Sequence, residues 1–312
     1  MTMRLLAASA LLAASVSAGP ALAENIGVTI ARADSTFLTL LRNGMEDHAA
    51  TLSGVTLQVE DAQNDPSRQL DQVQNFVASK VDAIIVAAVD GDSTPAMSKL
   101  AADAGIPIVY ANHPPADVDA LPAKGAFVGS NEVDSGTLQT VEVCRLLGGK
   151  GKIAVLMGPL NNHSSLVRTK DIEDVIATPD CSGMEIVDRQ SANWDRLEAQ
   201  NIVTNWLSSG MEVEAVIANN DEMAIGAIQA LKSVGTDMSK IVVAGIDATP
   251  DGLAAMEAGD LDVSVFQNAK AQGAASVDAA VKFARGEAAE SKVWVPFELV
   301  TPANIKDYQG KN

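Results

Sequence analysis

Two short segments of this chain end strand-like apolar runs with side chains suited to hydrogen bonding. Ala215–Ala218 is followed by Asn219-Asn220-Asp221, and residues 243–246 are followed by Asp247. In an α/β protein such a junction is the carboxyl end of a strand, where ligands bind. Amide and carboxylate groups such as those of Asn220 and Asp247 pair well with the hydroxyls of a polyol. The sequence has no nucleophile elbow, phosphate loop or metal-ligand cluster, so the pattern predicts recognition without catalysis.

The elements that must position these residues alternate between strand and helix. Apolar runs predict strands at 26–30, 55–60, 83–88, 107–110, 126–129, 153–157, 184–189, 215–218, 241–245 and 262–266. Helical spacing of apolar residues fills the intervals, for example at 37–48, 133–147 and 222–234. The alternation predicts an α/β fold with two doubly wound parallel-sheet lobes, helices on both faces of each sheet and a cleft between the lobes.

The first 23 residues are typical of a secretory signal. Arg4 supplies the positive charge, residues 5–16 form an apolar core, and Ala21-Leu22-Ala23 is a small-x-small cleavage site. The core is too short to span a bilayer, and no cysteine stands directly after the cleavage site to carry a lipid. We expect cleavage after Ala23, which leaves 289 of the 312 residues. That length favours two domains over one.

Net charge and cysteine content restrict the binding partners and the compartment that the sequence suggests. The net charge of −18 becomes −19 without Arg4, and it opposes binding to nucleic acid or to anionic membranes. Cys144 lies late in a predicted helix and Cys181 precedes a predicted strand, and both elements border the strand at 153–157. In an oxidising compartment we expect the two cysteines to form a disulfide, with two buried free thiols as the alternative.

A few side chains near predicted strand ends are candidates for ligand contact. Only 4% of the residues are aromatic, and Phe37 and Trp194 both lie in or near loops after strands. Phe37 also fits the apolar stripe of its helix, whereas Trp194 lies in a polar loop. Arg168 is either a surface arginine or a guanidinium that reaches the cleft. His113 ends a strand, and the three histidines are too widely spaced to suggest a metal site.

Several motifs together resemble the type I periplasmic binding proteins, close to their ribose-binding group. The most specific are Asn220-Asp221-Glu222-Met223-Ala224, the segment Asp247-x-Thr249-Pro250-Asp251, and Asp61-Ala62-Gln63-Asn64-Asp65-Pro66. The resemblance covers essentially the whole chain after the signal segment. It implies a ligand held between the rings of Phe37 and Trp194. It also implies hydrogen bonds to the ligand hydroxyls from four polar side chains, those of Arg168, Asn220, Asp247 and Gln267.

The expected first-lobe contacts depart from the ribose-binding pattern. Asn112 and His113 replace an Asp-Arg pair, Asp34 and Ser35 replace two asparagines, and Leu38 replaces a second phenylalanine. These departures argue against ribose. The loop from Asp34 to Phe37 and the segments 131–136 and 294–302 look most similar to the inositol-binding branch. The resemblance therefore favours a cyclic polyol, myo-inositol or a derivative, over a pentose.

The same resemblance implies the division of the chain and its partners. The first lobe would hold residues 24–130 and 268–298, and the second would hold 131–267 and 299–312. Such a receptor is a periplasmic monomer without cofactor or metal. It closes on its ligand and then docks on the membrane permease of an ABC importer, whose ATPase drives uptake.

Three other functions compete with this interpretation. The same protein could present a pentose or hexose to a chemoreceptor or a membrane sensor, which the sequence does not distinguish from transport. A sugar-modifying enzyme is a more remote alternative, because no nucleophile–base arrangement is visible. A transcriptional regulator of this fold would need an N-terminal helix-turn-helix where this chain has a signal sequence.

Overall fold

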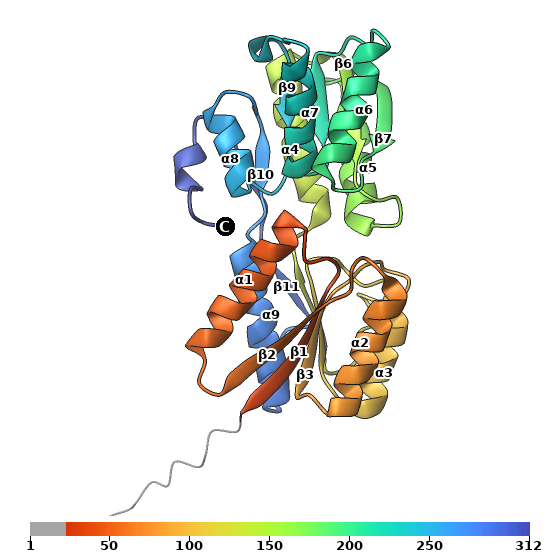
Figure 1. Cartoon of the computed structure of the whole chain (residues 1–312), viewed down its shortest axis with the longest axis vertical. Helices are drawn as coiled ribbons and strands as arrows, with labels where there is room; N and C mark the ends of the chain where they lie inside the picture. The colour runs from red at the N-terminus through yellow and green to blue at the C-terminus, as the bar shows by residue number, and fades with distance from the viewer. Residues whose placement is uncertain (1–22) are drawn as a thin grey trace, which may run out of the picture.

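The computed structural model describes residues 23–312, which form two lobes stacked along the long axis of the molecule (Figure 1). Apart from Ala23, the expected signal segment lies outside the described residues. Within residues 23–312, no helix is both long enough and apolar enough to cross a membrane.

The first lobe is built on a parallel sheet with the strand order β11-β5-β4-β3-β1-β2. Helices α1 and α9 cover one face of this sheet, and α2 and α3 cover the other (Figure 1). The strands are β1 (Glu24–Ile30), β2 (Val55–Asp61), β3 (Ala83–Ala87), β4 (Ile108–Ala111), β5 (Gly125–Gly129) and β11 (Lys292–Trp294). The helices are α1 (Thr36–Thr51), α2 (Pro66–Ser79), α3 (Thr94–Ala104) and α9 (Ala269–Ala284).

Strand β3 shows why this sheet needs helices on both sides. Its five residues are all buried, and successive side chains point to opposite faces. Ile85 packs into the core under α1 and α9, whereas Ile84 and Val86 pack into the core under α2 and α3. A continuous apolar run is therefore the pattern of a central parallel strand.

The second lobe repeats this arrangement with a parallel sheet in the order β7-β6-β8-β9. Helices α4 and α5 pack together, as do α6 and α7, and two separate cores contain the residues beneath them. The strands are β6 (Lys150–Met157), β7 (Gly183–Ser191), β8 (Ala215–Ala218) and β9 (Val242–Ala244). The helices are α4 (Glu132–Leu147), α5 (His163–Ile176), α6 (Arg196–Ser208), α7 (Asp221–Ser233) and α8 (Pro250–Glu257).

Two short strands extend the second lobe beside β9. Strand β10 (Ser264–Phe266) pairs antiparallel with β12 (Glu298–Val300), and parallel bridges join Ala244 to Val263 and Asp247 to Phe266. Short 3-10 helices lie at Met238–Lys240 and Ile305–Asp307. The disulfide between Cys144 and Cys181 links α4 to the segment before β7, with the two Cα atoms 5.7 Å apart.

The chain passes between the two sheets three times: after β5, after β10, and between β11 and β12. These passages bring helix α9 and strand β11, from late in the chain, to the lobe that holds the N-terminal strands (Figure 1). The predicted α/β fold with two doubly wound lobes is confirmed. The residue limits of the lobes, 24–130 with 268–298 and 131–267 with 299–312, stay a prediction.

Candidate ligand-binding site

A cavity of about 470 Å³ lies between the two lobes, lined by residues from both. Its lining residues follow the carboxyl ends of the parallel strands, as do Ala31 and Arg32 after β1, residues 112–113 after β4, and Asn220 after β8. Loops at this end of an open α/β sheet form the usual ligand crevice. Because the two sheets direct these ends toward one cavity, residues far apart in sequence lie around a single volume.

Nine of the ten residues that the sequence analysis proposes as ligand contacts line this cavity. They are Ser35, Phe37, Asn112, His113, Arg168, Trp194, Asn220, Asp247 and Gln267. Leu38, named as a departure from the ribose-binding pattern, also lines it. The geometry therefore brings together one aliphatic and two aromatic side chains with amides, a carboxylate, an imidazole and a guanidinium.

Asp34 does not line the cavity, in contrast to the expectation. Its carboxylate accepts a hydrogen bond from Arg32 Nε at 2.7 Å, and its side chain is 77% exposed. The ion pair holds the pKa of Asp34 below its usual value, through the hydrogen bond from Arg32 first. Arg32, which the sequence analysis did not select, lines the cavity in its place.

Arg168 is fully enclosed on helix α5, so the alternative of a surface arginine is wrong. Its Nε donates to Glu132 Oε2 at 2.8 Å, and its Nη1 donates to the Asn219 carbonyl at 2.7 Å. Its Nη2 makes longer contacts of 3.4 Å to Glu132 Oε1 and to Gln267 Oε1. A guanidinium carries five N–H groups, so one Nη1–H remains. That nitrogen lies 4.0 Å from Asp247 Oδ1.

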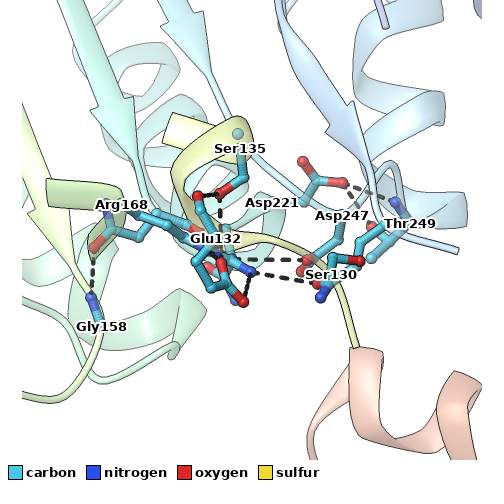
Figure 2. A network of polar contacts seen from close by, with 12 residues as sticks. Ser130, Glu132, Ser135, Gly158, Arg168, Asp221, Asp247 and Thr249 are labelled. Carbon is cyan, nitrogen blue, oxygen red and sulfur yellow. Dashed lines mark hydrogen bonds and ion pairs between the residues drawn. The ribbon is translucent and has the colours of Figure 1, made fainter. Parts of the chain in front are cut away.

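Glu132 holds this guanidinium in place from the first turn of helix α4 (Figure 2). Both side chains are only 5% exposed. Burial by itself lowers the pKa of Arg168, but the negative charges of Glu132 and Asp247 outweigh it and raise that pKa. The charged fork of Arg168 is thus fixed before any ligand arrives, and a preorganised donor loses little freedom on binding.

Asp247 follows β9 and faces the Nη1 side of Arg168. Its backbone has a φ of +120°, which non-glycine residues rarely adopt. Burial raises the pKa of Asp247, Arg168 opposes that change, and the charges of Asp221 and Glu132 add to it. The carboxyl group has no hydrogen-bond partner among the side chains of residues 23–312, so both of its oxygens remain free for a ligand.

Two amides beside Asp247 also keep unused donors. Asn220 caps helix α7, and its Oδ1 accepts from Met223 N at 3.0 Å. Its Nδ2 has no hydrogen-bond partner among residues 23–312. Gln267 uses Oε1 to accept from Arg168, and its Nε2 has no partner in the described part of the chain. The second-lobe wall therefore offers amide and guanidinium donors around one carboxyl acceptor.

The first-lobe wall contributes acceptors. His113 Nδ1 lies 2.8 Å from the Ala88 carbonyl, which accepts only, so Nδ1 carries the proton and Nε2 is the acceptor. Burial lowers the pKa of His113 and keeps the ring neutral. Asn112, with a φ of +67°, donates from Nδ2 to Gln272 Oε1 at 3.1 Å and keeps its Oδ1 available.

The two aromatic side chains come from different lobes. Phe37 was expected either in the core or at the ligand, and it does both: it packs in the first-lobe core and also lines the cavity. Trp194 packs directly over Gly158, where any side chain would collide with the indole. The Arg168 guanidinium carbon lies 5.6 Å from the Trp194 ring centroid, within range of a cation–π contact.

Sequence reasoning missed several polar residues at the cavity. Arg32, Asn64, Asn161, Asn162, Ser164, Asn193 and Glu198 all line it. All of them lie in the loops or first helical turns that follow β1, β2, β6 and β7, so the same positional signal could have found them. Glu132 also follows a strand end, that of β5, but its role depends on Arg168, which only the packing of α4 against α5 brings to it. Within residues 23–312, no cluster of three potential metal ligands occurs.

This arrangement suits a neutral molecule that carries many hydroxyl groups. Each hydroxyl can donate to Asp247 or His113 and accept from Arg168, Asn220 or Gln267. Aromatic and aliphatic surfaces from Phe37, Leu38 and Trp194 can cover the apolar faces of a ring.

Comparisons with known proteins agree with the fold. The family model described as a periplasmic binding protein domain matches residues 26–288. A candidate rhizopine-binding protein of Rhizobium meliloti is 62% identical over 290 residues, covering 93% of this chain and 94% of that protein. A xylitol-binding protein of Mycolicibacterium smegmatis is 34% identical, covering 90% of this chain and 78% of its own.

A solved structure of an ABC transporter solute-binding protein from Bacillus halodurans, with bound myo-inositol, is also similar. It is 44% identical, has a TM-score of 0.88, and the match covers 94% of this chain and 100% of that one. With a family model that spans most of its length and relatives that match it almost from end to end, the chain belongs to the periplasmic binding protein family.

Proposed function

We propose that the protein is the periplasmic solute-binding receptor of an ABC importer and that it binds a cyclic polyol between its lobes. The observation that carries the proposal is the cavity that both lobes line, in which Arg168, Asp247, Asn220 and Gln267 keep unused donors and acceptors. A ligand that contacts both lobes stabilises the arrangement in which they are close together.

Our first choice of ligand is myo-inositol or a derivative. The similarity to a protein with bound myo-inositol supports this choice, as do the acceptors Asn112 and His113 in place of a charged pair. An amino-substituted inositol belongs to the same class.

A thermal-shift screen of residues 24–312 tests the ligand class. The panel is myo-inositol, scyllo-inositol, an amino-substituted inositol, xylitol, ribose, galactose, xylose and arabinose. A ligand that binds only the folded state raises the melting temperature, by several degrees at a large excess over Kd. Shifts confined to the inositols are expected. A shift confined to a pentose or hexose would contradict the choice of ligand, and calorimetry should give one site per chain.

We also infer that the protein releases its ligand unchanged and acts as a monomer in the periplasm. The NMR spectrum of the ligand should stay constant during long incubation with the protein, and a new product would contradict this role. Deletion of the gene should abolish uptake of the ligand. Normal uptake with lost chemotaxis toward the ligand would instead indicate the sensory role.

A further inference from the structure

The loop that presents Asp247 is held in an unfavourable conformation. Asp247 and Ala248 both have positive φ angles, +120° and +48°, and neither is glycine. Such angles persist only where the surrounding structure enforces them. Backbone contacts on one side come from strand β10, because Asp247 N donates to the Val265 carbonyl at 2.8 Å and its carbonyl accepts from Gln267 N at 3.2 Å.

The next two amide groups of the loop are controlled by Asp221. Its Oδ2 accepts from Thr249 N at 2.8 Å and from Thr249 Oγ1 at 3.2 Å. Its Oδ1 accepts from Ser264 Oγ at 2.7 Å, and Ser264 Oγ accepts in turn from Ala248 N at 3.1 Å. One carboxylate thus fixes two successive amides of the loop: Thr249 N directly, and Ala248 N through the hydroxyl group of Ser264.

The residues packed against the Asp221 carboxylate lack side chains at two positions. Asp221 is completely buried at the start of helix α7. A Cβ atom at Gly245 or at Gly252 would collide with its carboxylate oxygens. Glycine at both positions, one before and one after the loop, therefore lets the loop pass close to Asp221. Figure 2 shows Asp221 beside Thr249 of this loop.

We propose that Asp221 is a positioning residue for ligand binding, which holds the loop 247–249 so that the Asp247 carboxyl group faces the cavity. Asp221 itself is not among the residues that line the cavity. Asp221 therefore affects ligand binding only by fixing the conformation of Asp247. This inference rests on the proposed function, since it assumes that Asp247 contacts the ligand.

The first test needs no ligand. Asp221→Asn keeps the shape of the side chain but turns one acceptor into a donor. Either Thr249 N–H then loses its acceptor, or the Ser264 hydroxyl must reverse and its own hydrogen loses the Asp221 acceptor. Hydrogen exchange of a peptide covering residues 246–252 is expected to become at least about tenfold faster in this variant. The matched control is Asp262→Asn, which removes a carboxylate that accepts from Val243 N at 2.9 Å in the same lobe. Unchanged protection of 246–252 would overturn the proposal.

The second test measures the Kd of myo-inositol. Asp221→Asn is expected to weaken binding at least about fivefold, since only the fraction of molecules with a correctly placed Asp247 binds well. Ser264→Ala, which removes only the relay to Ala248, should act in the same direction if the first variant does not fold. If wild-type protein fails to bind myo-inositol, the choice of ligand fails, but the exchange experiment still decides the role of Asp221.

Rescue separates positioning from general stability. Ala248→Gly relieves the positive φ of residue 248, but it also removes a completely buried methyl group. In the Asp221→Asn background it should therefore lower the melting temperature further and yet recover part of the myo-inositol affinity. If affinity falls together with stability in the double variant, Asp221 does not act through this loop.

Discussion

At the scale of single residues, Asp247 places a buried carboxyl group in the cavity without a hydrogen-bond partner among residues 23–312. It is 3% exposed and lies 4.0 Å from Arg168, too far for a hydrogen bond, so neither group satisfies the other. A ligand hydroxyl between them would donate to the carboxyl group and accept from the guanidinium. The protein therefore pairs a strong acceptor with a strong donor and leaves the space for the ligand.

Asp247→Ala should weaken ligand binding tenfold to a hundredfold. A hydrogen bond to a charged group contributes about 1.5–3 kcal/mol, and its loss leaves a ligand hydroxyl without a partner. Calorimetry with the ligand found in the thermal-shift screen measures the effect. Asp237→Ala removes an exposed carboxylate of the same lobe and serves as the control. Equal affinities of the Asp247 variant and the wild type would exclude Asp247 from the binding site.

At the scale of helices and strands, most of the fold was predictable because each element carries a local signal. Helix α2 begins as expected at Asp65-Pro66, where Asp65 caps Ser67 N and Pro66 needs no amide partner. Strands β11 and β12 were not predicted as elements of the fold. They have three residues each, too few to show a period, and exist through pairing with β5 and β10.

The cavity residues differ in the same way: some carry a local signal in the sequence, and others depend on contacts between distant segments. Residues such as Asn220 and His113 stand at strand ends, so their sequence position already suggests the cavity edge. Glu132 also follows a strand end, but its pairing with Arg168 could not be predicted, because only the packing of α4 against α5 brings these two residues, 36 positions apart, together. Asp34 departs from the expectation for a local reason, since it pairs with Arg32, two residues before it, and its side chain stays exposed to solvent.

Helix α5 carries a buried carboxyl group that should make stability depend on pH. Asp171 packs against Gly136 of α4, and its Oδ2 has no hydrogen-bond partner within residues 23–312. Burial, followed by the charges of Asp174 and Glu132, raises its pKa from the ordinary 3.8 to about 7. Between these two values the folded state holds a proton that the unfolded state has lost, so this contribution to stability declines as the pH rises.

Asp171→Asn should therefore stabilise the protein more at pH 8 than at pH 5. Denaturant unfolding at the two pH values measures the difference between variant and wild type. That difference isolates Asp171 from other groups, including His113, whose lowered pKa acts in the opposite direction. A variant effect that is the same at both pH values would contradict the expected protonation of Asp171 in the folded protein.

The disulfide joins elements that pack on one face of the second sheet. Cys144 and Cys181 are 37 positions apart, and closing a loop of that size stabilises a fold by about 2–4 kcal/mol. Changing both cysteines to serine should lower the unfolding free energy by that amount and leave ligand affinity unchanged, because neither residue lines the cavity. Thiol titration of the denatured wild type without reductant should find no free thiol, and two would show that the bond is absent.

At the scale of the whole molecule, the two lobes touch through a contact that does not involve the ligand. Thr36 Oγ1, in the first turn of α1, donates to Glu222 Oε1 at 3.0 Å across the cleft. Arg196 fixes that carboxylate with two hydrogen bonds of 2.9 and 3.0 Å, and it also contacts Asp251 at 2.7 Å. The negative charge of Glu222 faces the positive end of the α1 dipole. This contact forms only when the lobes are close together.

Thr36→Val keeps the branched shape of the side chain but removes the hydroxyl that crosses the cleft. If the contact helps to hold the lobes together, the fraction of binding-competent molecules falls, and the apparent Kd rises by the same factor for every ligand, about fivefold. Thr51→Val is the matched control, because Thr51 Oγ1 donates to His48 O at the other end of the same helix. Calorimetry with two inositols measures both variants. A factor that differs between the two ligands would mean that Thr36 acts on the ligand directly, and an unchanged Kd would mean that the contact does not influence how the lobes close.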